Sequence, residues 1–233
     1  MDIVLIRPAY HAMKEFIHAG GNQHPINLLY LQGVLKQRGF SVSVLDLQVE
    51  KHDDDSLRQL FRSRYPKAVG VTVMTPCYGS AMQISRLAKE EGITVIWGGA
   101  HPSAVPHETL ENAEVDIVVR GEGEISLAQV MGRLTTGESL EGIDGVSFKK
   151  DGHSIHNPPR APMEDLDKLP LPERKSLPLH LYRGVVAPGI PKKSTVMFTA
   201  RGCPATCIFC ASNIVHGRKY RYRSIENIME EVG

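Results

Sequence analysis

The sequence lacks several features that define other classes of protein. No stretch approaches the roughly 18 consecutive apolar residues of a membrane-spanning helix, so we expect no membrane span. A net charge of +1 gives no indication of a nucleic-acid partner. The segment Met1–Ile6 has no basic region of the kind that begins a signal peptide. We therefore expect a cytoplasmic protein of ordinary globular composition, with room for one or two domains.

Cysteine is also scarce, with four residues in the chain, and this scarcity disfavours a disulfide framework. Cys77 stands alone and is expected to be a small buried apolar residue. Cys203, Cys207 and Cys210 stand in one loop at the spacing C-x3-C-x2-C. Three thiolates on a tight loop can hold three irons of a cubane iron–sulfur cluster and leave the fourth iron open for chemistry.

A zinc site is the alternative use of these cysteines, with His216 as the fourth ligand. Zinc sites favour C-x2-4-C pairs followed by a second pair or by two spaced histidines. The spacing of this loop fits that pattern poorly, so zinc is the weaker interpretation.

Apolar runs alternate with helical patterns through the first part of the chain and predict five strand–helix units in series. Such a series favours an α/β fold with a right-handed, doubly wound, five-stranded parallel sheet. The expected strands are Asp2–Arg7, Phe40–Leu47, Ala68–Thr75, Ile93–Gly98 and Asp116–Val119. The expected helices begin at Pro25, near Asp53, at Gly79, near His107 and after Arg120.

Ligands of such sheets bind at the carboxyl ends of the strands, where the strand order reverses. The loops expected there follow Arg7, Thr75, Gly98 and Arg120. The pair Gly98-Gly99 fits a place where backbone must approach a ligand closely, although a simple turn explains it equally well.

The pattern changes after residue 142. Val146–His156, with Asp151-Gly152 at its centre, predicts a β-hairpin. Asn157–Pro191 is rich in proline and charge, which is typical of a linker. Ser194–Thr199 is expected to be a strand that delivers the cysteine loop, and Ser224 is expected to cap a helix over Ile225–Val232. We therefore divide the chain into residues 1–142, 143–192 and 193–233, and we expect the basic run 218–223 to be solvated.

The cysteine loop resembles the radical S-adenosylmethionine (radical SAM) superfamily. The resemblance includes Arg201-Gly202 before the first cysteine, Pro204 after it and Phe209 before the third. It implies that Cys203, Cys207 and Cys210 ligate a [4Fe-4S] cluster and that Phe209 lies beside the adenine of S-adenosylmethionine. It also implies reductive cleavage of S-adenosylmethionine to a 5′-deoxyadenosyl radical.

Residues 1 to about 140 resemble the cobalamin-binding, flavodoxin-like domain that precedes the radical SAM core in one large class. The resemblance rests on His24–Leu31, Trp97–Pro102 and Val119–Glu124. The cofactor contacts that it implies are Thr72, Met74, Gly98, Gly99, Gly121 and Glu122. Thr72 and Met74 depart from the Ser-x-Leu element of related domains.

The Asp-x-His-x-x-Gly motif, whose histidine ligates cobalt in other cobalamin enzymes, is absent after the first strand. The resemblance therefore implies cobalamin without a histidine lower ligand. Candidate neighbours of the cofactor are His11, His18, His24 and His101, although a lone histidine in a loop is more often solvated or capping.

Together the resemblances imply a cobalamin-dependent radical SAM enzyme that methylates, cyclises or oxidises a small-molecule substrate at an unreactive carbon. The electron would come from a reductant such as flavodoxin or ferredoxin. The alternative is a non-catalytic module that binds cobalamin or another nucleotide-tailed ligand and keeps a remnant cluster loop. No residue is assigned a catalytic role.

A partial (β/α)6 barrel needs on the order of 200 residues, and the sequence contains only its first strand–helix unit. We therefore expect the isolated chain to be incomplete, and to be inactive or unstable around its last 40 or so residues, because one such unit cannot bury its own core.

Overall fold

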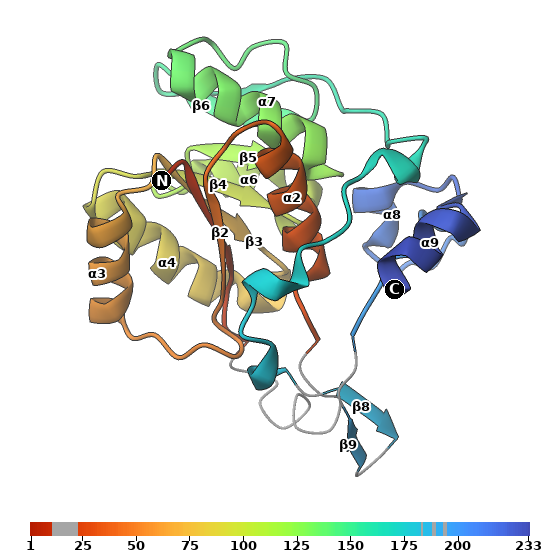
Figure 1. Ribbon diagram of the computed structural model, residues 1–233. Coiled ribbons are helices and arrows are strands. Elements are labelled where there is room, and N and C mark those ends of the chain that lie inside the picture. Colours follow the sequence, from red (N-terminus) through yellow and green to blue (C-terminus); the bar gives the residue numbers. More distant parts are fainter. Residues whose placement is uncertain (11–22, 183, 188–189, 193–194) are drawn as a thin grey trace.

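A seven-stranded sheet organises the molecule (Figure 1). The computed structural model describes residues 1–10, 23–182, 184–187, 190–192 and 195–233, so the candidates His11 and His18 lie outside it. The strand order is β2-β1-β3-β4-β5-β6-β7. The parallel strands are β1 (Ile3–Arg7), β2 (Val42–Asp46), β3 (Ala68–Thr72), β4 (Thr94–Gly98) and β5 (Ile117–Val119). The expected α/β class and parallel arrangement are confirmed.

Helices cover both faces of the sheet because the central strands are apolar on both sides. Alternate strand residues feed two separate cores. On one face, α2 (Ile26–Gln37) and α7 (Gly123–Thr136) pack on Ile3, Leu5 and Ile96. On the other, α3 (Asp54–Arg64) and α4 (Tyr78–Glu90) pack on Val4, Val69 and Trp97. Figure 1 shows α3 and α4 on the side of the strands away from α2.

Local signals set the helix boundaries largely as the sequence predicts. The Asp53 carboxylate accepts a hydrogen bond from the Ser56 N–H, 2.9 Å away, and so caps α3. Pro25 precedes α2, where its missing N–H removes no helical bond. Two short helices, α5 (Ala100–Ala104) and α6 (Pro106–Glu111), connect β4 to β5.

The predicted hairpin belongs to the sheet and not to a linker. It forms β6 (Val146–Lys150) and β7 (His153–His156), and β6 pairs antiparallel with β5. Phe148 lies opposite Ile117 and is buried in the core of the α2 and α7 face. The expectation of five strands is therefore wrong, because an apolar face on the hairpin lets it pair with the free edge of β5.

Residues after the hairpin run back across the domain. They contain short 3-10 turns at Leu166–Lys168, Arg174–Ser176 and Leu179–Leu181 and a small hairpin, β8 (Gly184–Ala187) with β9 (Ile190–Lys192). Leu166, Leu169 and Leu177 are buried against the α2 and α7 face, so this segment packs on the sheet domain.

The carboxyl-terminal segment contains β10 (Ala200–Arg201), α8 (Ser212–His216), β11 (Arg221–Tyr222) and α9 (Ile225–Val232). The helix over Ile225–Val232 and its Ser224 cap are confirmed. The strand expected over Ser194–Thr199 is not formed at residues 195–199; residue 194 lies outside the description. Only Ala200 and Arg201 pair, antiparallel with β11, because a longer strand needs a hydrogen-bonding neighbour.

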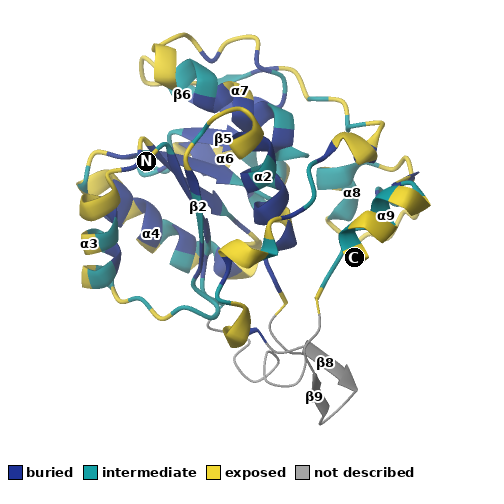
Figure 2. Ribbon diagram, in the orientation of Figure 1, coloured by how far each residue is buried: buried dark blue, intermediate teal, exposed yellow. Residues whose placement is uncertain are grey.

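The basic run 218–223 is not uniformly solvated, contrary to expectation. Arg221 and Arg223 are buried, and each pairs with a buried carboxylate, Glu122 and Glu231. Figure 2 shows the sheet in the dark blue of buried residues, whereas α9 has exposed residues. Within the part of the chain that the structure describes, no helix is long and apolar enough to cross a membrane.

Candidate functional site

A cavity of about 570 Å³ opens at the carboxyl edge of the sheet. It lies beside β1 and β3. The chain passes from β1 to β2 on one side of β1 and later enters β3 on the other side of β1. That reversal of strand order is where open α/β sheets bind ligands. The carboxyl-terminal segment lines the cavity as well, through Phe198, Arg201, Val215 and His216.

Two strand glycines line the cavity, and one of them, Gly98, keeps it open. Gly70 and Gly98 lie on the sheet face that packs against α2 and α7, two residues from Ala68 and Ile96 on the same face. The Leu5 side chain fills the space beside Gly70, since its Cδ2 would lie 2.8 Å from a Cβ there, whereas Gly98 has room for a side chain and leaves a slot between the sheet and the helices. Leu28, Leu31 and Leu127 form its helical walls. The slot is therefore deep and largely apolar, as small-molecule sites usually are.

The adjacent glycines Gly98 and Gly99 have different reasons to be glycine. A Cβ on Gly98 would lie 3.5 Å from the nearest atom, the Val119 carbonyl oxygen, so the fold has room for a side chain there. Gly99 has φ 101°, and a Cβ would lie 2.9 Å from the Val73 carbonyl oxygen. Gly99 is thus required by the backbone, whereas Gly98 keeps the slot open.

The other predicted contacts lie at the rim. Thr72, Met74 and Gly121 all line the cavity, and Met74 is half exposed. The Thr72 hydroxyl accepts a hydrogen bond from the Asn27 amide at 3.1 Å, which joins the end of β3 to the start of α2. Gly121 has φ 69°, and its N–H donates to the Ser103 hydroxyl at 2.9 Å. The structure therefore brings these predicted residues together at one edge of the sheet.

Cys77 also lines the cavity and is buried, as expected for a small apolar residue. Burial raises the pKa of its thiol, so the thiol stays protonated near neutral pH.

A charged cluster stands beside the cavity at the end of β1. Asp46 is fully buried and accepts hydrogen bonds from the Arg7 Nε and the Tyr182 hydroxyl, both at 2.7 Å. Burial, followed by the neighbouring Asp46, raises the pKa of Tyr182, so this hydroxyl stays protonated and donates to Asp46. Since Arg7 lines the cavity while Asp46 holds it, the guanidinium keeps a fixed direction.

Two of the four histidine candidates are described. His24 lines the cavity, its ring lies edge-on to Tyr182 at 4.4 Å, and its Nδ1 lies 3.2 Å from the Thr195 hydroxyl. Burial lowers the pKa of His24, with Arg174 and Arg7 adding to the effect. His101 bonds the Thr75 hydroxyl through Nδ1 at 3.1 Å, and burial lowers its pKa also.

Glu122 lies in the cavity wall but its carboxylate is engaged by protein groups. Arg221 donates to both of its oxygens, at 2.8 and 3.0 Å, and the Met163 N–H donates at 2.9 Å. His216 Nδ1 lies 3.1 Å away. Burial alone raises the pKa of Glu122, but the bonds from His216 and Arg221 outweigh it and lower that pKa to about 2. Glu122 is therefore an ion-pair centre, and a direct cofactor contact is not required to explain it.

The cysteine loop is open to solvent. Cys207 and Cys210 are exposed and Cys203 is half-buried, while Ile208 and Phe209 are among the most exposed apolar residues. Among the described residues, no three cysteine, histidine or acidic side chains are gathered as a metal-binding group. The ligand role of the three cysteines and the adenine contact of Phe209 therefore remain predictions.

Sequence reasoning missed Gly70 and the partners of Arg201. A glycine inside the apolar run Ala68–Thr72 was a usable signal, since strand glycines often mark a close approach. The contact between Arg201 and Glu124, at 2.6 Å, joins residues far apart in the chain and had no local signal.

Comparison with known proteins shows which proteins this chain is similar to. Residues 16–131 match the family described as the B12 binding domain. The chain is 30% identical over 233 residues to an uncharacterized methyltransferase of Pyrococcus horikoshii, across 99% of this chain and 49% of that protein. It is 30% identical over 240 residues to the anaerobic magnesium-protoporphyrin IX monomethyl ester cyclase of Rubrivivax gelatinosus, across 100% of this chain and 42% of the cyclase.

Two solved structures share the fold. The radical S-adenosylmethionine methyltransferase TsrM from Kitasatospora setae, solved with cobalamin and a [4Fe-4S] cluster, gives a TM-score of 0.72 at 22% identity, covering 100% of this chain and 45% of TsrM. The cobalamin-dependent S-adenosylmethionine radical enzyme OxsB, solved with aqua-cobalamin and S-adenosylmethionine, gives 0.78 at 19% identity, covering 99% of this chain and 31% of OxsB. The chain thus spans half or less of the length of these proteins.

Proposed function

We propose, from the premise that this chain belongs to the radical SAM proteins with an amino-terminal B12-binding domain, that it binds cobalamin in the cavity at the carboxyl edge of its sheet and carries the [4Fe-4S] loop of the same enzyme. The observation that carries the proposal is the slot left open by Gly98. The reaction class is methylation or cyclisation of a small molecule at an unreactive carbon, as the names of the relatives suggest.

The cavity suits the nucleotide tail of cobalamin, which the carboxyl edge of the sheet takes in the class that this chain resembles. Its walls are apolar at depth, while the Arg7 guanidinium and the Thr72 hydroxyl stand at its rim. Its volume lies within the roughly 300–1,000 Å³ of typical ligand sites. We assign cofactor contact to Thr72, Met74, Gly98 and Gly121, and we assign to Gly99 and Glu122 the shaping of the backbone and of the cavity wall.

The donor set of the loop suits an iron–sulfur cluster. Three thiols on one exposed loop, Cys203, Cys207 and Cys210, are the ligand type that such clusters require. Exposed Ile208 and Phe209 on the same loop offer an apolar contact for a bound nucleoside. When bound, cobalamin supplies a transferable methyl group, and the cluster supplies the electron for cleavage of S-adenosylmethionine.

The chain's own residues would bind and orient the cofactors and would exclude water from the site. Apolar side chains of α2 and α7 exclude water from the slot, and Asp46 holds Arg7 at its edge. A reductant such as flavodoxin or ferredoxin, in a reducing cytoplasm, completes the proposal.

Metal content after anaerobic reconstitution with iron, sulfide and hydroxocobalamin tests both cofactors at once. We expect near four irons per chain and about one cobalt. Gly98→Val should lose cobalt and keep iron, because the valine side chain fills the slot while its Cβ makes only ordinary contacts. A triple variant with Cys203, Cys207 and Cys210 replaced by alanine should lose iron and keep cobalt.

Gly79→Val is the matched control, since a Cβ on this α4 glycine meets nothing within 4 Å and Gly79 is not among the cavity-lining residues. It should bind both cofactors like the unaltered chain. Unchanged cobalt in Gly98→Val would show that the slot is not the cobalamin site. Zinc in place of iron would remove the radical SAM part of the proposal.

The second candidate is a cobalamin-binding module without turnover, which the match of residues 16–131 to the B12 binding domain supports by itself. Cobalt binding together with no iron and no cleavage of S-adenosylmethionine would select this candidate.

A further inference from the structure

The root of the cysteine loop is tied to the cavity wall by a buried cluster of two arginines and two glutamates, here called the ionic latch: Glu122, Glu124, Arg201 and Arg221. The side chains of all four are at most 7% exposed. Glu122 comes from the loop after β5 and Glu124 from the first turn of α7, and the arginines come from β10 and β11. The latch therefore joins parts of the chain that are 77 to 99 residues apart.

The two arginines stand opposite each other in the β10–β11 ladder. Arg201 donates to the Glu124 carboxylate at 2.6 Å and lies 3.6 Å from Glu122. Arg221 forms a two-bonded pair with Glu122. Two positive charges thus meet two negative charges in a site with little water, where breaking one pair leaves a costly uncompensated charge.

Aromatic packing holds Arg201 in addition to its ion pairs. Its guanidinium carbon lies 5.4 Å from the centre of the Tyr30 ring on α2 and 5.8 Å from that of Phe198. Cation–π attraction holds a guanidinium placed over aromatic rings, and lysine lacks its planar fork. The guanidinium of Arg201 is therefore held by Glu124, Tyr30 and Phe198 together.

The latch is continuous with both candidate cofactor sites. Glu122, Glu124 and Arg201 line the cavity, and Arg201 precedes Cys203 by two residues. The residue between them, Gly202, has φ 85°, and a Cβ there would collide with the Lys219 carbonyl oxygen, so this close approach requires glycine. The Cys203 N–H also donates to the Gly217 carbonyl at 3.2 Å.

We propose that Glu124 and Glu122 are positioning residues that act through Arg201 and Arg221 to hold the cysteine loop at the mouth of the cavity, so that the cluster and cobalamin keep a fixed separation. This inference rests on the proposed function for the identity of the two cofactors. It gives Glu122 and Glu124 a role in setting the distance between the two cofactors, and no role in binding either one.

Glu124→Gln in the full chain is the first test, because glutamine keeps the size of glutamate and removes its charge. In the cofactor-free protein, hydrogen exchange at the Cys203 amide should accelerate about tenfold or more, since local opening follows the loss of a buried pair. In the protein loaded with both cofactors, magnetic broadening between Co(II) and the reduced cluster should become weaker and more heterogeneous. Iron and cobalt content should stay unchanged.

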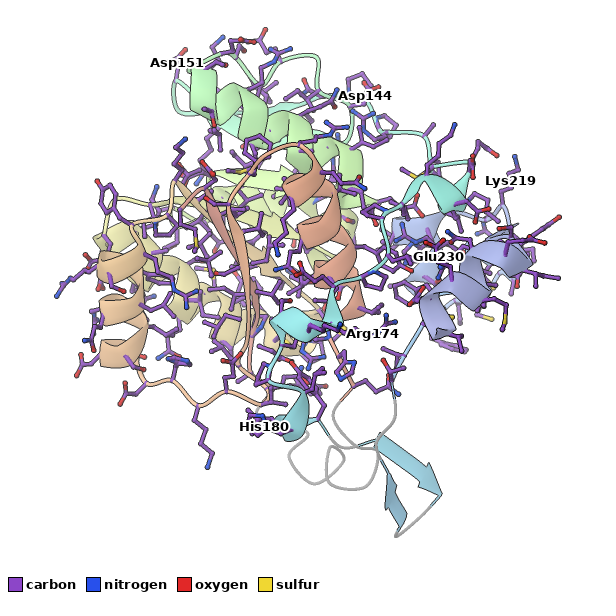
Figure 3. The ribbon with its side chains drawn as sticks, in the orientation of Figure 1. Asp144, Asp151, Arg174, His180, Lys219 and Glu230 are labelled. Carbon is purple, nitrogen blue, oxygen red and sulfur yellow. The ribbon has the colours of Figure 1, made fainter. Side chains whose placement is uncertain are left out.

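Arg201→Lys keeps the charge and loses the fork and the stacking, so it should show the same change in broadening at a smaller size. Glu164→Gln is the control: it removes an exposed ion pair with Lys219, which Figure 3 places at the outer side of the carboxyl-terminal segment. This control should leave exchange and broadening unchanged.

The outcomes separate the two proposals. If the unaltered chain takes up no iron or no cobalt, the proposed function fails. If both cofactors load and Glu124→Gln leaves Cys203 exchange and the magnetic broadening as they were, the latch has no positioning role. If Glu124→Gln unfolds, Arg201→Lys carries the test alone through the same two readouts.

Discussion

Single residues of this protein show how one amino-acid type serves different purposes at adjacent positions. Gly98 leaves open space that the cavity needs, whereas Gly99 adopts a backbone conformation that other residues rarely reach. The sequence presents them as one Gly-Gly pair, for which a turn and a ligand contact were equal interpretations. The turn describes Gly99, and ligand contact at Gly98 remains a prediction.

We predict that alanine substitutions distinguish these two glycines by their effect on the free energy of unfolding, with no ligand present. Gly99→Ala should lower the free energy of unfolding by about 1–3 kcal/mol, the usual cost of a strained backbone conformation. Gly98→Ala should change it by less than about 1 kcal/mol, because its Cβ has room. Urea unfolding of both variants measures the difference, and equal losses would contradict the separate roles.

At the scale of elements, the hairpin β6–β7 shows how an edge determines what pairs with it. β5 is a parallel strand with a free edge, and the hairpin covers that edge with antiparallel bonds. The pattern of Val146–His156 predicted the hairpin correctly. Its place in the sheet depended on Phe148 reaching the core across from Ile117, which the local pattern did not reveal.

We therefore predict that Phe148→Ala lowers the free energy of unfolding by about 3–5 kcal/mol, as truncation of a buried aromatic residue does. Lys150→Ala in the same strand should cost less than about 1 kcal/mol, because Lys150 makes only an exposed ion pair with Glu141. Denaturant unfolding of the two variants measures this. A small effect of Phe148→Ala would contradict the assignment of the hairpin to the core of the sheet domain.

At the scale of the whole molecule, buried ionisable groups link stability to pH. His24 and His101 have pKa values lowered from 6.5, first of all by burial, so both are neutral in the folded chain at pH 7. The unfolded chain binds protons at these groups as the pH falls below 6.5, and the folded chain does so only at lower pH. Their contribution to stability is therefore present above pH 6.5 and is lost as the pH decreases.

Glu122 acts in the same direction in a lower range. Its folded pKa of about 2 lies below its ordinary 4.5, so its stabilising contribution is present above pH 4.5 and is lost as the pH falls towards 2. We predict that the free energy of unfolding decreases between pH 7 and 5.5 and decreases again below 4.5. Urea unfolding across this range, with His24→Gln reducing the first decrease, tests it; a stability that rises on acidification contradicts it.

The sequence by itself determined the local features of this protein. Apolar periodicity, helix caps and turn residues predicted the parallel strands, their helices and the edge where Thr72, Met74, Gly98 and Gly121 gather, and the spacing of three cysteines identified the loop for testing. The tertiary structure decided the hairpin's place in the sheet, the slot beside Gly98 and the partners of Arg201, Arg221 and Arg223. Those features join residues distant in the chain, and such pairings arise only when packed elements bury a charge or leave a space.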